Sequence, residues 1–182
     1  MRRGSQTVLF EMTVVLTKLM APILSFTAEE IWRTLPEPAR TEVGRRSVHL
    51  TAVPQADPNW MDAKLAERWD ELLKVRSWVQ AKLEEKRREK IIGSSLEAKV
   101  RISAPSERYE FLKLYEPDLP STFIVSQVEL RRDDQLEQIP DFAVEVEKAT
   151  GNKCERCWNY RPAVGTVKSH PTLCDRCVEA VQ

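Results

Sequence analysis

Two Cys-x-x-Cys pairs near the C-terminus constrain the fold of this 182-residue chain more than any other feature. The pairs hold all four cysteines, and sixteen residues separate them. Each pair lets two thiolates point at one ion from a tight turn, and the spacing lies within the zinc-ribbon window. Two pairs complete a tetrahedral shell that leaves no position for a reactive water. We therefore predict one structural Zn²⁺, bound by Cys154, Cys157, Cys174 and Cys177.

Disulfides, a redox dithiol and a histidine-containing site are the alternatives to this zinc site. Disulfides suit secreted mini-domains, but the chain opens with Met1-Arg2-Arg3-Gly4 and an amphipathic stretch, without an apolar signal segment. A redox pair would open a helix in a βαβ unit, whereas turn-forming residues surround these pairs. His170, four residues before Cys174, is a candidate replacement ligand. The favoured setting is a reduced cytoplasm with bound metal.

The composition is that of a soluble globular protein, with 42% apolar and 31% charged residues. No apolar run approaches the ~18 residues that a membrane span requires, so we expect no membrane partner. The net charge of zero neither supports nor excludes nucleic acid. Residues 152–182 carry five basic against three acidic side chains, a net of +2, which four thiolates and one zinc ion would bring near neutrality.

The N-terminal part is predicted to form a helix, a kink and a shorter helix over residues 5–35. Pro22 interrupts the first apolar period because it lacks a backbone donor. Thr27 and Glu30 have the spacing of a capping box for the second helix, which stops at Pro36. The apolar face is wide enough to require partner helices, so we predict an incomplete bundle.

In the later segments the spacing of the apolar residues changes along the chain. Residues 36–59 are predicted to be extended or loop, with a brief strand or tether over 47–50. A long helix is predicted from near Trp60, ended by Gly93. Its charged run over 84–90 indicates a solvated face, with a phosphate-contacting surface as the alternative. Beyond Gly93 the patterns predict strands over 98–102, 123–130 and 142–147 and a short helix over 105–114.

The predicted fold class is therefore mainly α with a small α+β unit. We divide the chain into a partial helical bundle with a linker (1–59), a long helix with the α+β unit (60–150) and a zinc-binding module (151–182).

Catalytic patterns are missing from the sequence. Its five glycines form neither a dinucleotide-binding motif nor a P-loop, and there is no Gly-x-Ser-x-Gly elbow. Glu29 and Glu30 fit helix-start residues better than a catalytic pair. We expect no autonomous active site.

Several local motifs together resemble one family. Residues 19–32, Leu-Met-Ala-Pro-Ile-Leu-Ser-Phe-Thr-Ala-Glu-Glu-Ile-Trp, resemble the closing helices of the anticodon-binding bundle in class I aminoacyl-tRNA synthetases. Residues 90–98, Lys-Ile-Ile-Gly-Ser-Ser-Leu-Glu-Ala, resemble the start of the junction domain of bacterial isoleucyl-tRNA synthetases. Residues 153–158, Lys-Cys-Glu-Arg-Cys-Trp, and 174–177, Cys-Asp-Arg-Cys, resemble the terminal zinc module of the same enzymes. The resemblance covers essentially the whole chain.

The resemblance implies the C-terminal part of an isoleucine–tRNA ligase, starting within the anticodon-binding bundle. The family's His-Ile-Gly-His and Lys-Met-Ser-Lys-Ser motifs, its nucleotide-binding core and its editing domain are not in this sequence. The chain alone is therefore not expected to activate isoleucine. The implied partners are isoleucine tRNA and the catalytic and editing domains of a cytoplasmic parent enzyme, itself expected to be a monomer.

The resemblance also implies candidate tRNA contacts. Arg156 and Trp158 flank Cys157, so zinc would fix both side chains, and RNA loops are read by aromatic stacking with Arg or Lys on phosphates and base edges. The alternatives are that Trp158 packs over the zinc site or the junction domain and that the arginines are plain surface charge. The weaker candidates are Tyr160, Arg161, Lys168 and Arg176.

Two other functional classes are alternatives to this one. A DNA-binding zinc ribbon of the base-excision glycosylase type would require an N-terminal Pro-Glu and a helix–two-turn–helix, and the chain begins Met1-Arg2-Arg3 instead. A free-standing interaction module is the other alternative.

Overall fold

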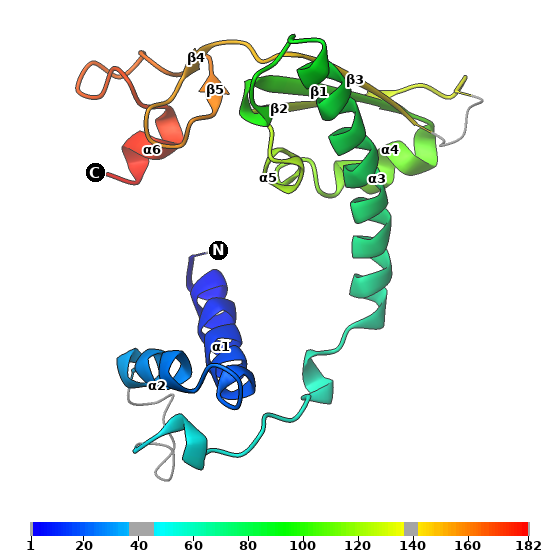
Figure 1. Cartoon of the computed structure of the whole chain (residues 1–182). Helices are drawn as coiled ribbons and strands as arrows, with labels where there is room; N and C mark the ends of the chain where they lie inside the picture. Colours follow the sequence, from blue (N-terminus) through cyan, green and yellow to red (C-terminus); the bar gives the residue numbers. More distant parts are fainter. Residues whose placement is uncertain (1, 37–45, 137–141, 182) are drawn as a thin grey trace. The chain divides into compact units, whose positions relative to one another are not determined.

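The computed structural model describes residues 2–36, 46–136 and 142–181. The chain divides into two compact units, Met1–Asp62 and Ala63–Gln182, each with its own core (Figure 1). Within the described ranges, none of the helices combines the length and the apolar character that crossing a bilayer requires.

In the residues of the first unit that the structure describes, the only regular elements are helices. Its elements are α1 (Arg2–Met20), α2 (Ser25–Thr34) and the 3-10 helices η2 (Val48–Leu50) and η3 (Pro58–Trp60). Pro22 lies in the turn between α1 and α2, where the sequence predicts the kink. Trp32 is the largest side chain of the core and is only 1% exposed. The Glu29 carboxylate accepts hydrogen bonds from the Ser47 hydroxyl at 2.8 Å and the Val48 N–H at 3.1 Å, which holds η2 against α2.

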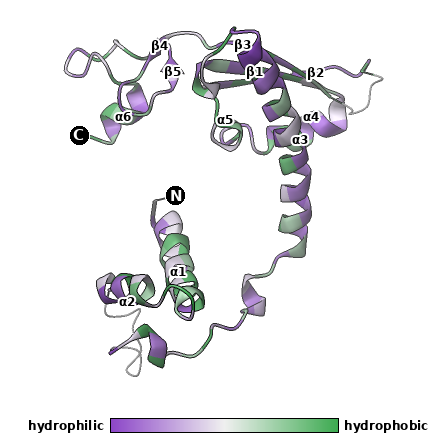
Figure 2. Cartoon of the chain, viewed as in Figure 1, coloured by the Kyte–Doolittle hydropathy of each residue, from purple (hydrophilic) through white to green (hydrophobic). Residues whose placement is uncertain are grey.

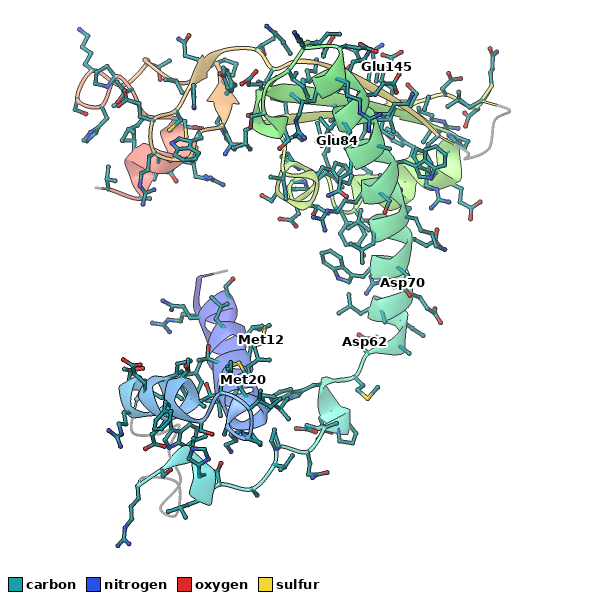
Figure 3. All side chains as sticks on the ribbon, in the orientation of Figure 1. Met12, Met20, Asp62, Asp70, Glu84 and Glu145 are labelled. Atoms are coloured by element: carbon teal, nitrogen blue, oxygen red, sulfur yellow. The ribbon has the colours of Figure 1, made fainter. Side chains whose placement is uncertain are left out.

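The small core of this unit leaves much of α1 uncovered. Five apolar side chains of α1 are 49–63% exposed, and the helix shows an apolar stripe in Figure 2. Met12, labelled in Figure 3, is one of them. The exposed set is Val8, Leu9, Met12, Leu16 and Leu19. Such a stripe is typical of a helix whose bundle is incomplete, in line with the prediction.

The second unit is an α+β domain followed by a small cysteine module. Its elements are α3 (Ala63–Arg88), η4 (Ser95–Glu97), β1 (Ala98–Ala104), α4 (Ser106–Lys113), α5 (Leu119–Phe123), β2 (Gln127–Arg132), β3 (Ala143–Lys148), β4 (Asn152–Lys153), β5 (Tyr160–Arg161) and α6 (Asp175–Glu179). The main sheet has the order β2-β1-β3, with β1 parallel to β2 and antiparallel to β3. A parallel pair needs a crossover, which α4 and α5 supply. The strands β4 and β5 form a separate antiparallel pair.

One face of the main sheet is apolar and covered. Alternate residues of β1 are fully buried, as the sequence period predicts. They pack with the buried face of α3, formed by Leu72, Val75, Val79 and Leu83. The exposed part of α3 carries charged side chains, such as Asp70 and Glu84, which stand on its surface in Figure 3, and also large apolar ones, among them Trp69 and Trp78. The predicted solvated run contains the ion pair Lys86–Glu89 at 2.8 Å.

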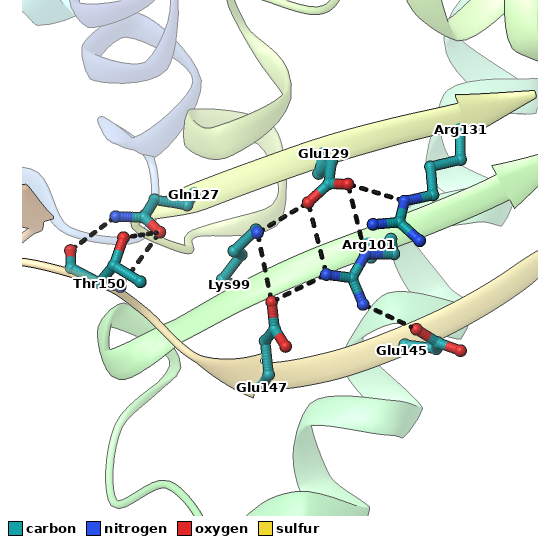
Figure 4. A network of polar contacts seen from close by, with 8 residues as sticks. All are labelled: Lys99, Arg101, Gln127, Glu129, Arg131, Glu145, Glu147 and Thr150. Carbon is teal, nitrogen blue, oxygen red and sulfur yellow. Dashed lines mark hydrogen bonds and ion pairs between the residues drawn. The ribbon is translucent and has the colours of Figure 1, made fainter.

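The other face of the sheet carries a charged lattice (Figure 4). Lys99 and Arg101 project from the central strand β1, between carboxylates of both neighbouring strands. The Lys99 Nζ lies 2.7 Å from Glu129 Oε2, and an Arg101 Nη lies 3.0 Å from Glu145 Oε2. The fold class is confirmed as mainly α with a small α+β unit.

Two predicted helix ends are wrong because the helices begin or end at other residues than those predicted. Helix α2 begins at Ser25 without a side-chain cap, so Thr27 lies inside its first turn and the predicted capping box does not form. Helix α3 ends at Arg88, and Lys90 takes a left-handed conformation (φ 59°), the role expected of Gly93. Gly93 instead donates its N–H to a Glu97 carboxylate oxygen at 3.0 Å.

Three predicted element boundaries also shift. Residues 47–50 contain the 3-10 helix η2 rather than a strand, because the Ser47 hydroxyl accepts the His49 N–H. The second strand begins at Gln127, since residues up to Phe123 belong to α5. The long helix begins at Ala63, three residues after Trp60. Part of the segment predicted as loop, 37–45, lies outside the described residues.

Candidate metal centre and adjoining surface

The four cysteines converge on one point. Their sulfur atoms all lie within 4.8 Å of one another, although the pairs are separated by sixteen residues. Cys154, Cys174 and Cys177 are at most 1% exposed. The Cys157 and Cys174 sulfurs are 3.8 Å apart, which matches the edge of about 3.8 Å of a tetrahedron with metal–sulfur bonds of about 2.3 Å. This donor set fits one tetrahedral thiolate-bound ion.

The first pair lies in a turn that follows β4. Trp158 donates its N–H to the Cys154 carbonyl at 2.8 Å, and Cys154 donates its own to the Asn159 carbonyl at 2.9 Å. The turn closes because Trp158 adopts a left-handed conformation, with φ of 63°. The turn therefore directs both sulfurs to one side and exposes 60% of the Trp158 residue.

The second pair begins the short helix α6. Cys174 is its N-cap residue, and its carbonyl accepts the N–H of Cys177 at 2.9 Å. The two halves are joined directly: Glu155 donates its N–H to the Thr172 carbonyl at 3.1 Å, and the Cys174 N–H lies 3.3 Å from the Cys154 sulfur. Backbone donors to sulfur orient thiolates for a metal and stabilise their charge.

The thiols have sharply different proton affinities without a metal. Burial acts to raise the pKa of Cys154, but N–H groups of Cys157, Cys174 and Arg156 outweigh it and lower that pKa to about 6. Burial, followed by the neighbouring sulfurs, raises the pKa of Cys174 to about 12. Four negative charges this close repel one another, and a divalent cation removes that restriction.

The alternatives to metal binding lack support in this geometry. All four thiols are free, and 3.8 Å between sulfurs is far beyond a disulfide bond of about 2.05 Å. Neither pair opens a helix of a βαβ unit. His170 is outside the only cluster of metal-binding side chains found in the described ranges; its backbone is bonded to Val167 and Leu173 in turns. Glu29 has a lowered pKa because the Ser47 hydroxyl donates to it, a structural contact rather than a catalytic pair.

The six candidate RNA contacts all belong to this module but differ in accessibility. Arg156 and Trp158 flank Cys157 and are exposed, and the Lys153 ammonium lies 5.5 Å from the centre of the Trp158 ring. Trp158 is 60% exposed, so much of its indole is not covered by the zinc site or by the α+β domain, and its contact with RNA stays a prediction. The other exposed candidates are Lys168 and Arg176, and the half-buried ones are Tyr160 and Arg161.

Contacts between this module and the α+β domain were not anticipated from the sequence. Tyr160 donates its N–H to the Ser126 hydroxyl at 2.7 Å, and its carbonyl accepts the Gln127 side-chain amide at 3.2 Å. Gln127 also bonds Thr150 through its amide nitrogen and oxygen. Gln127 begins β2 and Ser126 lies in the bend just before it, so no sequence signal distinguishes them from other polar residues near a strand.

Two family models match the chain. Residues 1–102 match the model described as the anticodon-binding domain of tRNA ligase, and residues 151–180 match the model described as a zinc finger found in FPG and IleRS. The second match includes both cysteine pairs.

Curated relatives extend the match to nearly the whole chain. It is 50% identical over 182 residues to an isoleucine–tRNA ligase of Syntrophotalea carbinolica, covering 97% of this chain and 19% of the relative. It is 44% identical to the enzyme of that name from Symbiobacterium thermophilum, covering 99% and 20%. For the Geobacter sulfurreducens enzyme the identity is 39%, covering 100% and 20%. The chain thus spans about a fifth of the length of these relatives.

Proposed function

The chain belongs to the anticodon-binding domain family of tRNA ligases, and on this basis we propose that it is the C-terminal, tRNA-binding portion of an isoleucine–tRNA ligase. Its partner is the anticodon stem-loop of isoleucine tRNA. The parent enzyme, a cytoplasmic monomer, carries out ATP-dependent aminoacylation on a catalytic domain and proofreads on an editing domain. Neither of those domains is in this chain.

One observation carries the proposal: the cysteine turn exposes a cation, Arg156, and an aromatic ring, Trp158, immediately before and after Cys157. The Arg156 side chain has no hydrogen bond or ion pair with any described residue, and Trp158 is 60% exposed. An exposed indole costs free energy unless a partner covers it. An unstacked RNA base is such a partner, since every base offers a flat face for stacking.

The remaining candidates have supporting roles in the proposal. Lys168 lies on an exposed loop between the two cysteine pairs and is available to a phosphate. Tyr160 is held by its backbone against the α+β domain, so its main contribution is to fix the module in place. Arg161 and Arg176 line a pocket beside α5.

Zinc has a structural role in this proposal. Cys154, Cys157, Cys174 and Cys177 would hold it, and the four-thiolate shell leaves no position for substrate or water. The core of the module is small: besides the cysteines it contains Val164 and the partly buried Leu173. So little apolar burial cannot offset the ordering entropy of about thirty residues, whereas zinc binding contributes ~10–16 kcal/mol in small zinc modules.

The glycosylase and free-standing-module alternatives are not favoured. The zinc-finger description names two protein classes, so that match alone does not choose between tRNA and DNA. The match over residues 1–102 and the isoleucine–tRNA ligase relatives support tRNA.

The test is equilibrium binding of the zinc-loaded chain to isoleucine tRNA, with leucine and valine tRNAs as competitors. We expect preferential binding of isoleucine tRNA. Trp158→Ala should weaken it by about 1–3 kcal/mol, roughly five- to 150-fold, because one stacked base is lost.

The matched control is Trp60→Ala, which removes a similarly exposed tryptophan (67%) outside the zinc module. It should leave the affinity within about twofold. Equal binding of all three tRNAs, unaffected by Trp158→Ala, would contradict the proposal.

A further inference from the structure

A pocket of about 260 Å³ lies where the cysteine module meets the α+β domain. We call it the seam pocket. Its polar and charged lining comes from both sides: Ser121 and Ser126 from the α+β domain, and Asn159, Arg161 and Arg176 from the cysteine module. The hydrogen bonds of Ser126 and Gln127 to Tyr160 fasten the two sides together at this place. The lining residues therefore keep their spacing.

The charged residues that line the seam pocket are all positive. Two arginines line it, and no carboxylate is among its lining residues in the described part of the chain. Ser126 is already used, since its hydroxyl donates to the Leu96 carbonyl and accepts the Tyr160 N–H. The donors left for a ligand are the two guanidinium groups and the Ser121 hydroxyl.

Arg161 is incompletely satisfied. Its Nε is buried and has no hydrogen-bond partner, and its closest carboxylate, Asp175, lies 3.9 Å from an Nη, at the outer limit of an ion pair. A buried donor without an acceptor is costly. The Arg176 side chain has no hydrogen bond or ion pair with any residue in the described ranges. Both cations are therefore short of an acceptor.

The size of the pocket restricts the ligand. Sites for drug-sized molecules are usually about 300–1,000 Å³, so 260 Å³ suits one small group rather than a whole nucleotide. Arginine forks match the geometry of phosphate oxygens, which explains their frequent use in phosphate binding.

The wall beside α5 is held in an unfavourable conformation. Ile124 has φ of 60°, which a β-branched residue rarely adopts. Its N–H bonds the Ser121 carbonyl, and Val125 bonds the Pro120 carbonyl at 2.9 Å. Strain of this kind concentrates at ligand sites, and here it lies at the C-cap of α5, next to Ser121 in the pocket wall.

We propose that the seam pocket binds one backbone phosphate of RNA, held by Arg161, Arg176 and Ser121. This inference rests on the proposed function for the identity of the ligand, but its anion chemistry stands on the pocket itself. It gives the RNA a second anchor, separate from the Trp158 ring.

The first test is direct and needs no tRNA. Arginine Nε–H signals are followed by NMR in the zinc-loaded chain while inorganic phosphate is added at constant ionic strength. We expect saturable shifts of the Arg161 and Arg176 signals and none of Arg68, an exposed arginine near the start of α3. Unmoved signals of Arg161 and Arg176 would overturn the inference.

The second test uses tRNA affinity as a function of salt. Arg161→Gln and Arg176→Gln should each weaken binding and lower the slope of log K against log salt, by about 0.7–0.9 when the two are combined, because the two arginines share one phosphate contact. Arg68→Gln is the matched control and should keep the wild-type slope. Asp175→Asn should strengthen binding, since it removes the carboxylate that competes for Arg161; damage to the fold could not have this opposite sign.

The outcomes separate the two proposals. If phosphate shifts the Arg161 and Arg176 signals and the arginine variants have reduced salt slopes, both the proposed function and the seam pocket are supported. Specific tRNA binding with wild-type slopes in both arginine variants overturns the seam pocket and leaves the proposed function. Phosphate shifts in a chain that binds no tRNA overturn the proposed function and support an anion site.

Discussion

Trp158 occupies a backbone conformation that glycine usually fills. Its φ of 63° lets its N–H reach the Cys154 carbonyl and close the cysteine turn. For a residue with a Cβ this conformation costs roughly 1–2 kcal/mol. The chain tolerates the cost at a position where the indole is 60% exposed, which is the pattern expected when strain serves binding.

Replacing Trp158 by glycine and by alanine separates the backbone from the ring. Both variants lose the ring and should lose tRNA affinity alike. Trp158→Gly removes the strain, so its zinc module should be about 1 kcal/mol more stable than that of Trp158→Ala. Zinc competition with a chelator measures this difference. A less stable glycine variant would show that the left-handed turn is not what closes the site.

Gly151 is required for a different reason. Its φ is +92°, and a Cβ there would lie 2.3 Å from the Arg161 carbonyl carbon and 2.4 Å from the Pro162 nitrogen. Gly151→Ala should therefore destabilise the pairing of β4 with β5 by at least about 1–3 kcal/mol and lower the melting temperature of the module.

Gly165→Ala is the matched control for that substitution. Gly165 has a similar φ of +95°, but the nearest atom to an added Cβ is 3.7 Å away. It carries the conformational cost without the clash, so it should be the milder change. Equal losses of melting temperature in the two variants would show that the backbone conformation, and not the clash, causes the destabilisation.

At the level of elements, the charged lattice on the sheet makes stability depend on pH. Hydrogen bonds from Lys99, then Arg131, lower the pKa of Glu129 from 4.5 to about 2. The folded state thus favours the ionised form, so this contribution is complete above pH 4.5 and is lost as pH falls towards 2. Glu129→Gln should be less stable at neutral pH and lose less stability on acidification.

The comparison is made by denaturant unfolding of both proteins from pH 7 to pH 2.5. Wild type and Glu129→Gln both release zinc on acidification, so the difference between their free energies of unfolding reports the contribution of Glu129. Glu67→Gln removes an exposed α3 carboxylate that has no ion pair within the described ranges and serves as control. A difference between wild type and Glu129→Gln that stays constant across this range would refute the role of the lattice.

The elements that the sequence predicted are those with a strong local period or a fixed spacing. Alternation identified β1, and the cysteine spacing identified the metal cluster before any geometry was known. What the sequence missed depends on tertiary contacts. Helix α5 has five residues, too few for a period, and Phe123 is buried at its end rather than in a strand. The left-handed Lys90, Ile124 and Trp158 are imposed by turns that no propensity indicates.

The site shows the same division. The thiolate set followed from spacing, and Arg156 and Trp158 followed from family resemblance. The seam pocket could not be predicted because Ser121 and Ile124 lie far in the sequence from Arg176, which completes the lining. The roles of the RNA-contacting residues stay predictions until binding is measured.

For the whole molecule, the proposed function joins a metal-ordered module to an RNA partner. Each of the two units has its own core, and the apolar stripe on α1 is exposed. The chain covers about a fifth of its relatives, and the proposed contribution of this part is to hold tRNA. We predict that this contribution depends on zinc, since the small core of the module cannot hold Trp158 and Arg156 in place by itself.

The most direct test is the affinity of the chain for the isoleucine anticodon stem-loop before zinc removal, after chelation and after zinc is restored. We predict at least a tenfold loss on chelation, in the range of one lost stacking contact of about 1–3 kcal/mol or more. Recovery should follow zinc addition, while the helical signal from α1 and α3 persists throughout. Unchanged affinity in a chain shown to be free of metal would contradict the account, because the RNA-binding side chains would then not require the cysteine site.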